Sequence, residues 1–407
     1  MKKIADILPG LLSETSKSLR RSEIRELLKI TRQPGIISFA GGLPYPGLFP
    51  TEVMKDVLST ILEREGDLAL QYGPTEGDSR LIDFLVKWMR KDEGAEIDKE
   101  NILIVSGAQQ ALDLISKVFI DPEDPIIIGL PSYIGALQAF RSIRAKMIGV
   151  PVGKQGMDVD KVEEILKKYG KKGEKIKFIY VVPDFQNPSG VTMTLERREK
   201  LLELCYEYGT IVIEDSPYRE LRFEGESIPM LGAMDKRGYA FSLHTFSKIL
   251  FPGTRIGWII ANKAIMDKLV MAKQPTDLCS SPFAQSVIYE FCRRGLLKPH
   301  IKKIVKVYRK KRDLMLEALE KYMPNEEGID WTHPHGGLFL WVSLPEHLDA
   351  EELFPKAVEK KVAYVMGSAF HFDRSGKNTM RLNFSFPSEE QIEEGIKRLA
   401  DLVVEVL

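Results

Sequence analysis

The sequence predicts an α/β protein: a large domain with a mostly parallel sheet flanked by helices, and a smaller α+β domain beside it. Short β-rich runs alternate along the chain with longer amphipathic stretches. The runs are continuous in Ile, Val and Tyr, as expected for strands that are covered on both faces. The 407 residues also exceed the usual size of a single hydrophobic core.

The elements of the large domain follow from this alternation. Helical patterns at 108–119, 162–168 and 195–208 separate several of the runs, and this order predicts a largely parallel sheet. The predicted strands are 102–106, 125–129, 178–182, 211–214, 240–244 and 256–261.

The pattern changes after Pro299, where a long basic amphipathic segment precedes a second group of strands. We therefore expect an N-terminal segment (1–48), a large domain (49–299) and a small domain (300–407). Residues 40–50 are too rich in Gly and Pro for a helix or a strand. We expect the N-terminal segment to pack against the small domain and over the site. The other predicted elements are helices at 22–29, 301–322 and 389–406, and strands at 338–343, 363–366 and 381–384.

Composition limits the classes of function. Lys plus Arg and Asp plus Glu both total 58, so net charge favours neither nucleic acid nor an anionic membrane as a partner. No run of about 18 apolar residues occurs, and we expect a cytoplasmic protein without membrane association. Cys205, Cys279 and Cys292 lie far apart without metal-like spacing, so we interpret them as structural and expect no metal.

A lysine follows one of the predicted strands. Residues 244–248 read HTFSK and lead to Arg255. The amine of a lysine held in a pocket can lose its proton near neutral pH and attack a carbonyl. Thr245, Ser247 and Arg255 would then supply hydroxyls and a fixed positive charge for a phosphate dianion. On spacing alone, a charged loop explains Lys248 equally well.

Two other predicted strands also end in residues that could bind a phosphorylated ring compound. At 105–110 (VSGAQQ) a strand ends in a small-residue turn and a helix begins, and such an N-terminus can bind an anion close to Gly107. At 214–218 (EDSPY), Asp215 could pair with a protonated ring nitrogen and Tyr218 could reach a ring oxygen. The first pattern is common, and an aspartate that caps a helix explains the second equally well.

Two further strand ends complete the set. Residues 186–190 (QNPSG) form an ordinary turn in isolation, and 131–133 (PSY) offers either an aromatic face or a core tyrosine. What matters is convergence, because five strand ends each present a residue type that one phosphorylated pyridine aldehyde needs.

These residues carry a family resemblance. The sequence resembles the fold-type I pyridoxal-phosphate-dependent aminotransferases of class I and II over essentially its whole length. The matching segments are 39–44 (FAGGLP), 72–77 (YGPTEG), 131–133 (PSY), 186–190 (QNPSG), Asp215 with Tyr218, Ser247 with Lys248, and 380–382 (MRL). The stretch 22–28 (SEIRELL) followed by FAGGLP is most similar to the broad-specificity branch that handles 2-aminoadipate and kynurenine.

The resemblance implies a role for each of these residues. Lys248 would be the catalytic residue that holds pyridoxal 5′-phosphate. Asp215 would pair with the ring nitrogen, Tyr218 and Asn187 would bond the ring oxygen, and Tyr133 would stack on the ring. The remaining cofactor contacts would come from Gly107, Ala108, Gln109, Thr245, Ser247, Arg255 and, from a second subunit, Tyr72.

Substrate binding and assembly follow from the same resemblance. Arg381 and Asn187 would hold the α-carboxylate of the substrate near Gly42, and sharing of Tyr72 predicts a homodimer. Arg25 would contact acidic side chains of substrates, although it also fits a solvated basic face. Thr245, where many relatives have serine, keeps the hydroxyl.

The implied activity is ping-pong transfer of the amino group of an L-amino acid to a 2-oxo acid such as 2-oxoglutarate. The donor would be 2-aminoadipate, glutamate, or an aromatic or aliphatic amino acid. A β-lyase or decarboxylase shares the cofactor-binding residues, but Arg381 together with Asn187 favours transamination. A ligand sensor of a transcription regulator needs a DNA-binding module, and the roughly forty residues before Gly41 lack a helix-turn-helix pattern.

Overall fold

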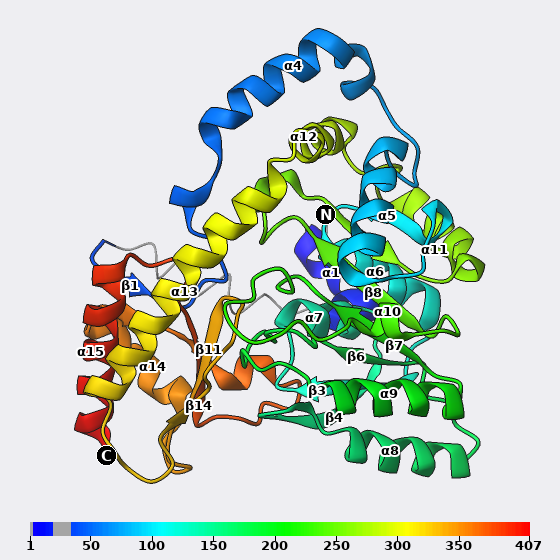
Figure 1. Ribbon diagram of the computed structural model, residues 1–407. Coiled ribbons are helices and arrows are strands. Elements are labelled where there is room, and N and C mark those ends of the chain that lie inside the picture. Colours follow the sequence, from blue (N-terminus) through cyan, green and yellow to red (C-terminus); the bar gives the residue numbers. More distant parts are fainter. Residues whose placement is uncertain (1–2, 19–33) are drawn as a thin grey trace.

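The computed structural model describes residues 3–18 and 34–407 and is built around an eight-stranded sheet (Figure 1). Its strand order is β2-β9-β8-β7-β6-β3-β4-β5. All pairs between β8 and β4 are parallel, whereas β9 is antiparallel to both β2 and β8, and β5 is antiparallel to β4. The strands are β2 (Ile102–Val105), β3 (Pro125–Leu130), β4 (Lys146–Gly153), β5 (Gly156–Met157), β6 (Phe178–Val181), β7 (Ile211–Asp215), β8 (Ala240–Thr245) and β9 (Gly257–Ile260).

Helices cover both faces of this sheet, which explains the continuous apolar runs. Alternate residues of a strand point to opposite faces. Ile127, Ile179 and Val212 belong to an apolar cluster with α8 (Val159–Lys171) and α9 (Leu195–Tyr208). Their neighbours in sequence belong to the larger core, which includes residues of α6 (Ala108–Phe119), α7 (Ile134–Ser142) and α11 (Lys263–Asp277).

A smaller antiparallel sheet lies beside the large one, with strand order β10-β11-β14-β13. The N-terminal segment joins this part of the molecule, because β1 pairs in parallel with β12. The predicted α/β fold class is therefore confirmed. The elements of this part are β1 (Ile37–Ser38), β10 (Asp330–Trp331), β11 (Phe339–Ser343), β12 (Val362–Ala363), β13 (Val365–Met366), β14 (Thr379–Asn383), α13 (Leu297–Tyr322), α14 (Ala350–Glu359) and α15 (Glu389–Val406).

The long helix α13 runs between the two parts of the chain (Figure 1). It begins four residues before the predicted helix at 301–322 and passes through Pro299, which the first turn of a helix tolerates. A division of the chain near Pro299 therefore falls inside a continuous helix.

Several helices were not predicted. Among them, α12 (Pro282–Arg293) packs against both α4 (Thr51–Ala69) and α5 (Ser79–Glu93). The sequence carries signals for α5, since Asp78 caps its N-terminus and Gly94 ends it at φ 68°. The short 3-10 and α elements are Pro46–Leu48, Lys99–Asn101, α10 (Leu231–Met234), Pro252–Thr254 and Gly367–Phe370.

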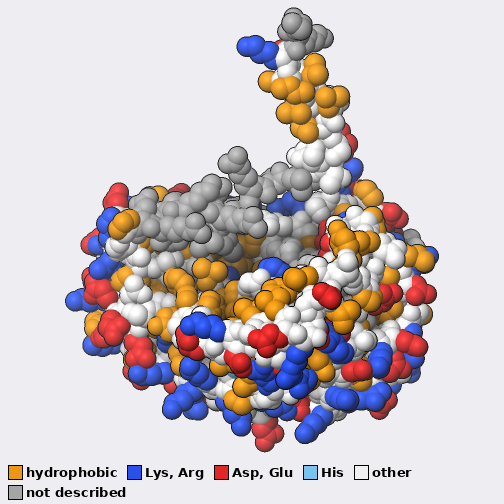
Figure 2. Space-filling view, turned by 90° about the horizontal axis from the view of Figure 1, so that it is seen from above, with side chains coloured by type: hydrophobic (Ala, Val, Ile, Leu, Met, Phe, Trp, Pro, Cys, Tyr) orange, Lys and Arg blue, Asp and Glu red, His pale blue; other side chains and the backbone are white. Residues whose placement is uncertain are grey.

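The N-terminus forms two short helices, α1 (Ile4–Leu11) and α2 (Glu14–Ser18). Figure 2 shows an apolar segment that projects from the body of the molecule, and α1 has no buried residue. The predicted helix at 22–29 lies outside the described residues. Within 3–18 and 34–407, no helix is long and apolar enough to cross a bilayer.

Candidate active site

Twelve of the predicted residues meet in one cavity of about 470 Å³ at the carboxyl ends of the central strands. It is lined by strand ends of the large sheet, by Arg381 of β14 and by the N-terminal segment. The predicted residues that line it are Gly42, Ala108, Gln109, Tyr133, Asn187, Asp215, Tyr218, Thr245, Ser247, Lys248, Arg255 and Arg381.

Lys248 follows β8 and reaches into this cavity. Its Nζ donates a hydrogen bond of 2.8 Å to the Gly42 carbonyl of the N-terminal segment. Burial, with the positive charges of Arg381 and Arg255, lowers the pKa of Lys248 to about 8. A substantial fraction of this amine is therefore uncharged near neutral pH, as a nucleophile or proton acceptor must be.

Asp215 ends β7 and is buried. Its Oδ2 accepts a hydrogen bond of 2.8 Å from the hydroxyl of Tyr180, whereas its Oδ1 has no partner among the described residues. Burial raises the pKa of Asp215 to about 7. A buried carboxylate oxygen without a donor is costly, so this atom fits a cationic ligand group in the cavity.

The start of α6 and the turn after β8 form a cradle for an anion. Gly107 precedes α6 at φ 82°, and a Cβ there would collide with the Arg255 guanidinium. Arg255 Nη1 donates to Ser247 Oγ at 3.2 Å, and Thr245 Oγ1 lies 2.9 Å from the same oxygen. Helix N–H groups, two hydroxyls and a guanidinium together match the oxygens of a phosphate.

Arg381 is fully buried on β14. Its Nη1 donates to Asn187 Oδ1 and its Nη2 to the Ala40 carbonyl, each at 2.8 Å, and the guanidinium lies over the Phe339 ring. Its Nε has no partner among the described residues, and burial lowers its pKa to about 10. A buried cation without a carboxylate partner in the described structure is a receptor for an anionic group.

Two tyrosines and an amide complete the cavity wall. Asn187 Nδ2 donates to the Tyr218 hydroxyl at 3.3 Å, and the Tyr133 hydroxyl donates to Gln109 Oε1 at 3.3 Å. Burial raises the pKa of Tyr133 to about 12 and that of Tyr218 well above its ordinary value. Both phenols therefore stay protonated near neutral pH and can donate hydrogen bonds.

Of the predicted residues, Gly107, which precedes the α6 wall of the cavity, and Tyr72 do not line it. Tyr72 is 78% exposed, and Arg25 lies outside the described residues. Sequence reasoning missed Tyr180, the donor to Asp215, and Phe339, which lies beneath Arg381. Both occupy predicted strands, but nothing in the sequence distinguishes them from other aromatic core residues.

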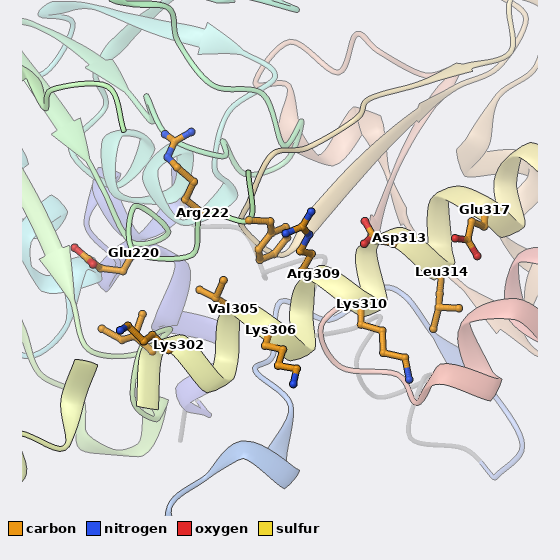
Figure 3. Close-up of a pocket in the computed structure, with 12 residues that line it drawn as sticks. Glu220, Arg222, Lys302, Val305, Lys306, Arg309, Lys310, Asp313, Leu314 and Glu317 are labelled. Atoms are coloured by element: carbon orange, nitrogen blue, oxygen red, sulfur yellow. The ribbon is translucent and has the colours of Figure 1, made fainter. Parts of the chain in front are cut away.

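A larger hollow of about 840 Å³ lies along α13 (Figure 3). Its charged side chains include Arg222, Lys302, Lys306 and Arg309, and acidic residues stand among them (Figure 3). It contains none of the predicted site residues. Charged side chains of both signs line this hollow, as is common on a solvated protein surface. The smaller cavity, which holds the predicted residues, is therefore the candidate site.

Comparison with known proteins shows the family of the chain. Residues 43–399 match the family model described as aminotransferase class I and II. The chain is 47% identical to aromatic-amino-acid aminotransferase 1 of Thermococcus litoralis, over 97% of this chain and 94% of the relative. It is 47% identical to the Pyrococcus horikoshii kynurenine aminotransferase solved in complex with PMP, with full coverage of both chains and a TM-score of 0.95.

A third similarity is to the α-aminoadipate aminotransferase of Thermus thermophilus, solved with N-(5′-phosphopyridoxyl)-L-leucine. The identity is 38%, the coverage is 98% of each chain and the TM-score is 0.90. The chain belongs to the class I and II aminotransferases. It is a pyridoxal-phosphate-dependent transaminase of fold type I, acting on amino acids and 2-oxo acids.

The cavity fits this cofactor on its own geometry. The unpartnered Asp215 Oδ1 suits a protonated ring nitrogen, and the Gly107 cradle with Arg255 suits the phosphate. Bound pyridoxal phosphate supplies an electron sink for bonds broken at the substrate α-carbon, while the protein positions and tunes it.

Proposed function

We propose that the chain transfers the amino group of broad-specificity L-amino acid donors, including 2-aminoadipate, glutamate, and aromatic and aliphatic amino acids, to a 2-oxo acid such as 2-oxoglutarate. The names of its relatives support the aromatic and 2-aminoadipate donors, and the leucine adduct bound to one relative supports an aliphatic donor. The observation that carries the proposal is that one cavity holds a lysine amine of lowered pKa together with a buried guanidinium.

Each residue then has a distinct task in a ping-pong reaction. Lys248 would hold the cofactor, and its amine, freed when the amino donor binds, would move a proton to and from the substrate α-carbon. Arg381, oriented by Asn187, binds the α-carboxylate bidentately and so helps to fix which bond at the α-carbon is broken. The Gly42 carbonyl holds the Lys248 amine in the cavity.

The cofactor contacts follow from the same cavity. Asp215 would pair with the ring nitrogen and keep it protonated, Tyr218 and Asn187 would bond the ring oxygen, and Tyr133 would stack on the ring. The phosphate would be held by Gly107, Ala108 and Gln109 at the start of α6, and by Thr245, Ser247 and Arg255.

The donor range is tested by steady-state kinetics with 2-oxoglutarate as acceptor. We expect 2-aminoadipate, glutamate, an aromatic amino acid, kynurenine and leucine all to be converted, with kcat/KM values that reveal the preferred class. Conversion of a single donor class with no measurable turnover of the others would contradict broad specificity, without affecting the assignment to the aminotransferases.

Arg25 is proposed to bind the side-chain carboxylate of acidic donors. Its replacement by glutamine should raise KM for 2-aminoadipate about tenfold or more, because the loss of one charge-assisted contact costs about 1.5–3 kcal/mol. The KM for leucine should stay nearly unchanged. Equal effects on both donors would refute a selective role, and replacement of Arg32 provides a control on the same basic stretch.

We also propose that the active form is a cytoplasmic homodimer whose sites each receive Tyr72 from the neighbouring subunit. Tyr72 is 78% exposed, and Leu68 and Leu70 beside it are 70% and 71% exposed. The projecting helix α1 adds Ile4 and Leu11, at 66% and 69% exposure (Figure 2). Large apolar side chains that are left exposed in this way are typical of protein interfaces.

Subunit mixing tests the shared site. Lys248→Ala and Tyr72→Ala subunits should each be impaired as homodimers. A mixed dimer should regain one intact site, because the Lys248→Ala chain donates its Tyr72 to the neighbour that keeps Lys248. About half of the wild-type activity per heterodimer is expected after co-refolding. No recovery, in mixtures where heterodimers are detected by mass, would contradict the sharing of Tyr72.

A further inference from the structure

Glu224, His333 and His335 form a cluster of metal-ligand atoms that none of the preceding functions uses. One ligand atom of each lies within 4.8 Å of the other two, which holds for no other group of His, Cys, Asp and Glu across 3–18 and 34–407. Glu224 Oε1 is 3.8 Å from His333 Nδ1 and 3.8 Å from His335 Nε2. We propose that these three residues bind a divalent transition-metal ion such as Zn²⁺.

The backbone holds the carboxylate against the histidine loop. The N–H groups of Phe223 and Glu224 both donate to the His335 carbonyl, at 2.8 and 3.3 Å, and Gly337 N–H donates to the Leu221 carbonyl at 2.9 Å. The segment 221–224 therefore lies directly beside 335–337. The relative position of the ligands is thus set by main-chain hydrogen bonds before any ion binds.

The buried Arg312 holds Glu224 and the loop of the two histidines in place by hydrogen bonds. Arg312 donates from Nη1 and Nη2 to the two oxygens of Glu224, at 2.9 and 3.2 Å, and from Nη1 to the Pro334 carbonyl between the two histidines. The Arg312 side chain is only 2% exposed, so these hydrogen bonds are shielded from solvent. Glu224 is therefore held in a fixed position, as carboxylate ligands with outer hydrogen bonds are in metal sites.

The charge of Arg312 opposes a cation, but it does not occupy the ligand position. A carboxylate oxygen has two lone pairs, so Glu224 Oε1 can accept from Arg312 and still bind an ion. Asp313 lies 2.6 Å from Arg312 Nε and offsets much of the guanidinium charge. The side chains of His333 and His335 are 63% and 55% exposed, so both imidazoles are open to solvent and to an incoming ion.

The ligand types select the ion. Two imidazole nitrogens and one carboxylate oxygen suit Zn²⁺ with water in the fourth position, whereas Mg²⁺ prefers oxygen ligands alone. Bonds of about 2.0–2.2 Å require the three ligand atoms to draw closer, which rotation of the exposed imidazoles allows. A bound ion would tie the chain before α13 to the chain after it, and so stabilise the folded protein.

The experiment uses untagged holoenzyme that has been dialysed against a chelator and titrated calorimetrically with Zn²⁺, and separately with Mg²⁺. We expect one Zn²⁺ per chain, a raised unfolding temperature with Zn²⁺, and no comparable effect of Mg²⁺. His333→Gln and His335→Gln should each weaken Zn²⁺ binding at least tenfold. His347→Gln is the matched control, since His347 is exposed and outside the cluster, and it should bind like the wild type.

The double variant His333→Gln/His335→Gln defines the background from other groups on the surface. Wild-type binding no tighter than that of this variant would overturn the proposal, as would an equal loss in His347→Gln. Neither readout uses catalysis, so the result is independent of the aminotransferase reaction.

Discussion

Replacement of Lys248 by alanine will abolish turnover while leaving the fold intact. The variant loses both the covalent attachment of the cofactor and the group that moves the proton, and general acid–base catalysis alone contributes about 10²–10⁴-fold. We expect kcat to fall by at least about 1000-fold. The side chain makes one hydrogen bond, to the Gly42 carbonyl, so the cavity should survive its removal.

Borohydride reduction and peptide mapping measure the attachment directly. In the wild type, the reduced cofactor should be found on Lys248, and in Lys248→Ala it should be bound only non-covalently. Lys263→Ala, at an exposed ion pair with Asp98, provides the control and should behave like the wild type. A reduced lysine–cofactor bond that persists in Lys248→Ala would show that another lysine holds the cofactor.

Replacement of Asp215 by asparagine will lower kcat by about 10²–10⁴-fold, because loss of one partner of a buried charge pair costs about 3–5 kcal/mol. The change keeps the size of the side chain and removes only its charge. The ring nitrogen then loses the carboxylate that keeps it protonated. An unchanged kcat in a variant with full cofactor occupancy would contradict the role of Asp215.

The same variant makes a pH-dependent prediction about stability without cofactor. Burial raises the pKa of Asp215 from 3.8 to about 7, so between these values the folded chain holds a proton that the unfolded chain has lost. The contribution of Asp215 to the free energy of unfolding therefore falls as pH rises through this window, and the full penalty is present above it.

Urea unfolding of the cofactor-free wild type and Asp215→Asn measures this effect. The free energy of unfolding of the variant relative to the wild type should increase by on the order of 2 kcal/mol between pH of about 5 and about 8. A difference that is constant with pH would mean that Asp215 is already ionised in the empty cavity.

Periodicity predicted those elements whose patterns are uninterrupted. Helices α6, α9 and α15 have the predicted bounds because each carries a clear apolar stripe between recognisable ends. Strand β4 was missed because Gly149 and Pro151 interrupt its apolar run. On its outer side β4 pairs with β5 only at Val152 and Gly153, so neither residue breaks a ladder there. The helices α4 and α12 pack on each other, and α12 also packs on α5, so their apolar faces are buried against helices and not against the central sheet.

The meeting of the candidate residues in one cavity was predictable because the carboxyl ends of parallel strands share one edge of the sheet. That rule brings Asp215, Lys248 and Asn187 together from separate segments. The bond from Tyr180 to Asp215 depends on the pairing of β6 with β7 and on its register, which the sequence does not specify. The proposed contribution of Tyr72 depends on how two chains associate, which the hydrophobic periodicity of one sequence does not predict.

The measurement that tests the account most directly is the half-reaction of purified holoenzyme with an amino donor and no acceptor. Adding glutamate or 2-aminoadipate should convert the bound cofactor to its amine form, with one equivalent of 2-oxo acid released per site. Later addition of 2-oxoglutarate should restore the original absorbance. Continuous release of ammonia or carbon dioxide without an acceptor, or no conversion by any donor, would contradict transamination at this site.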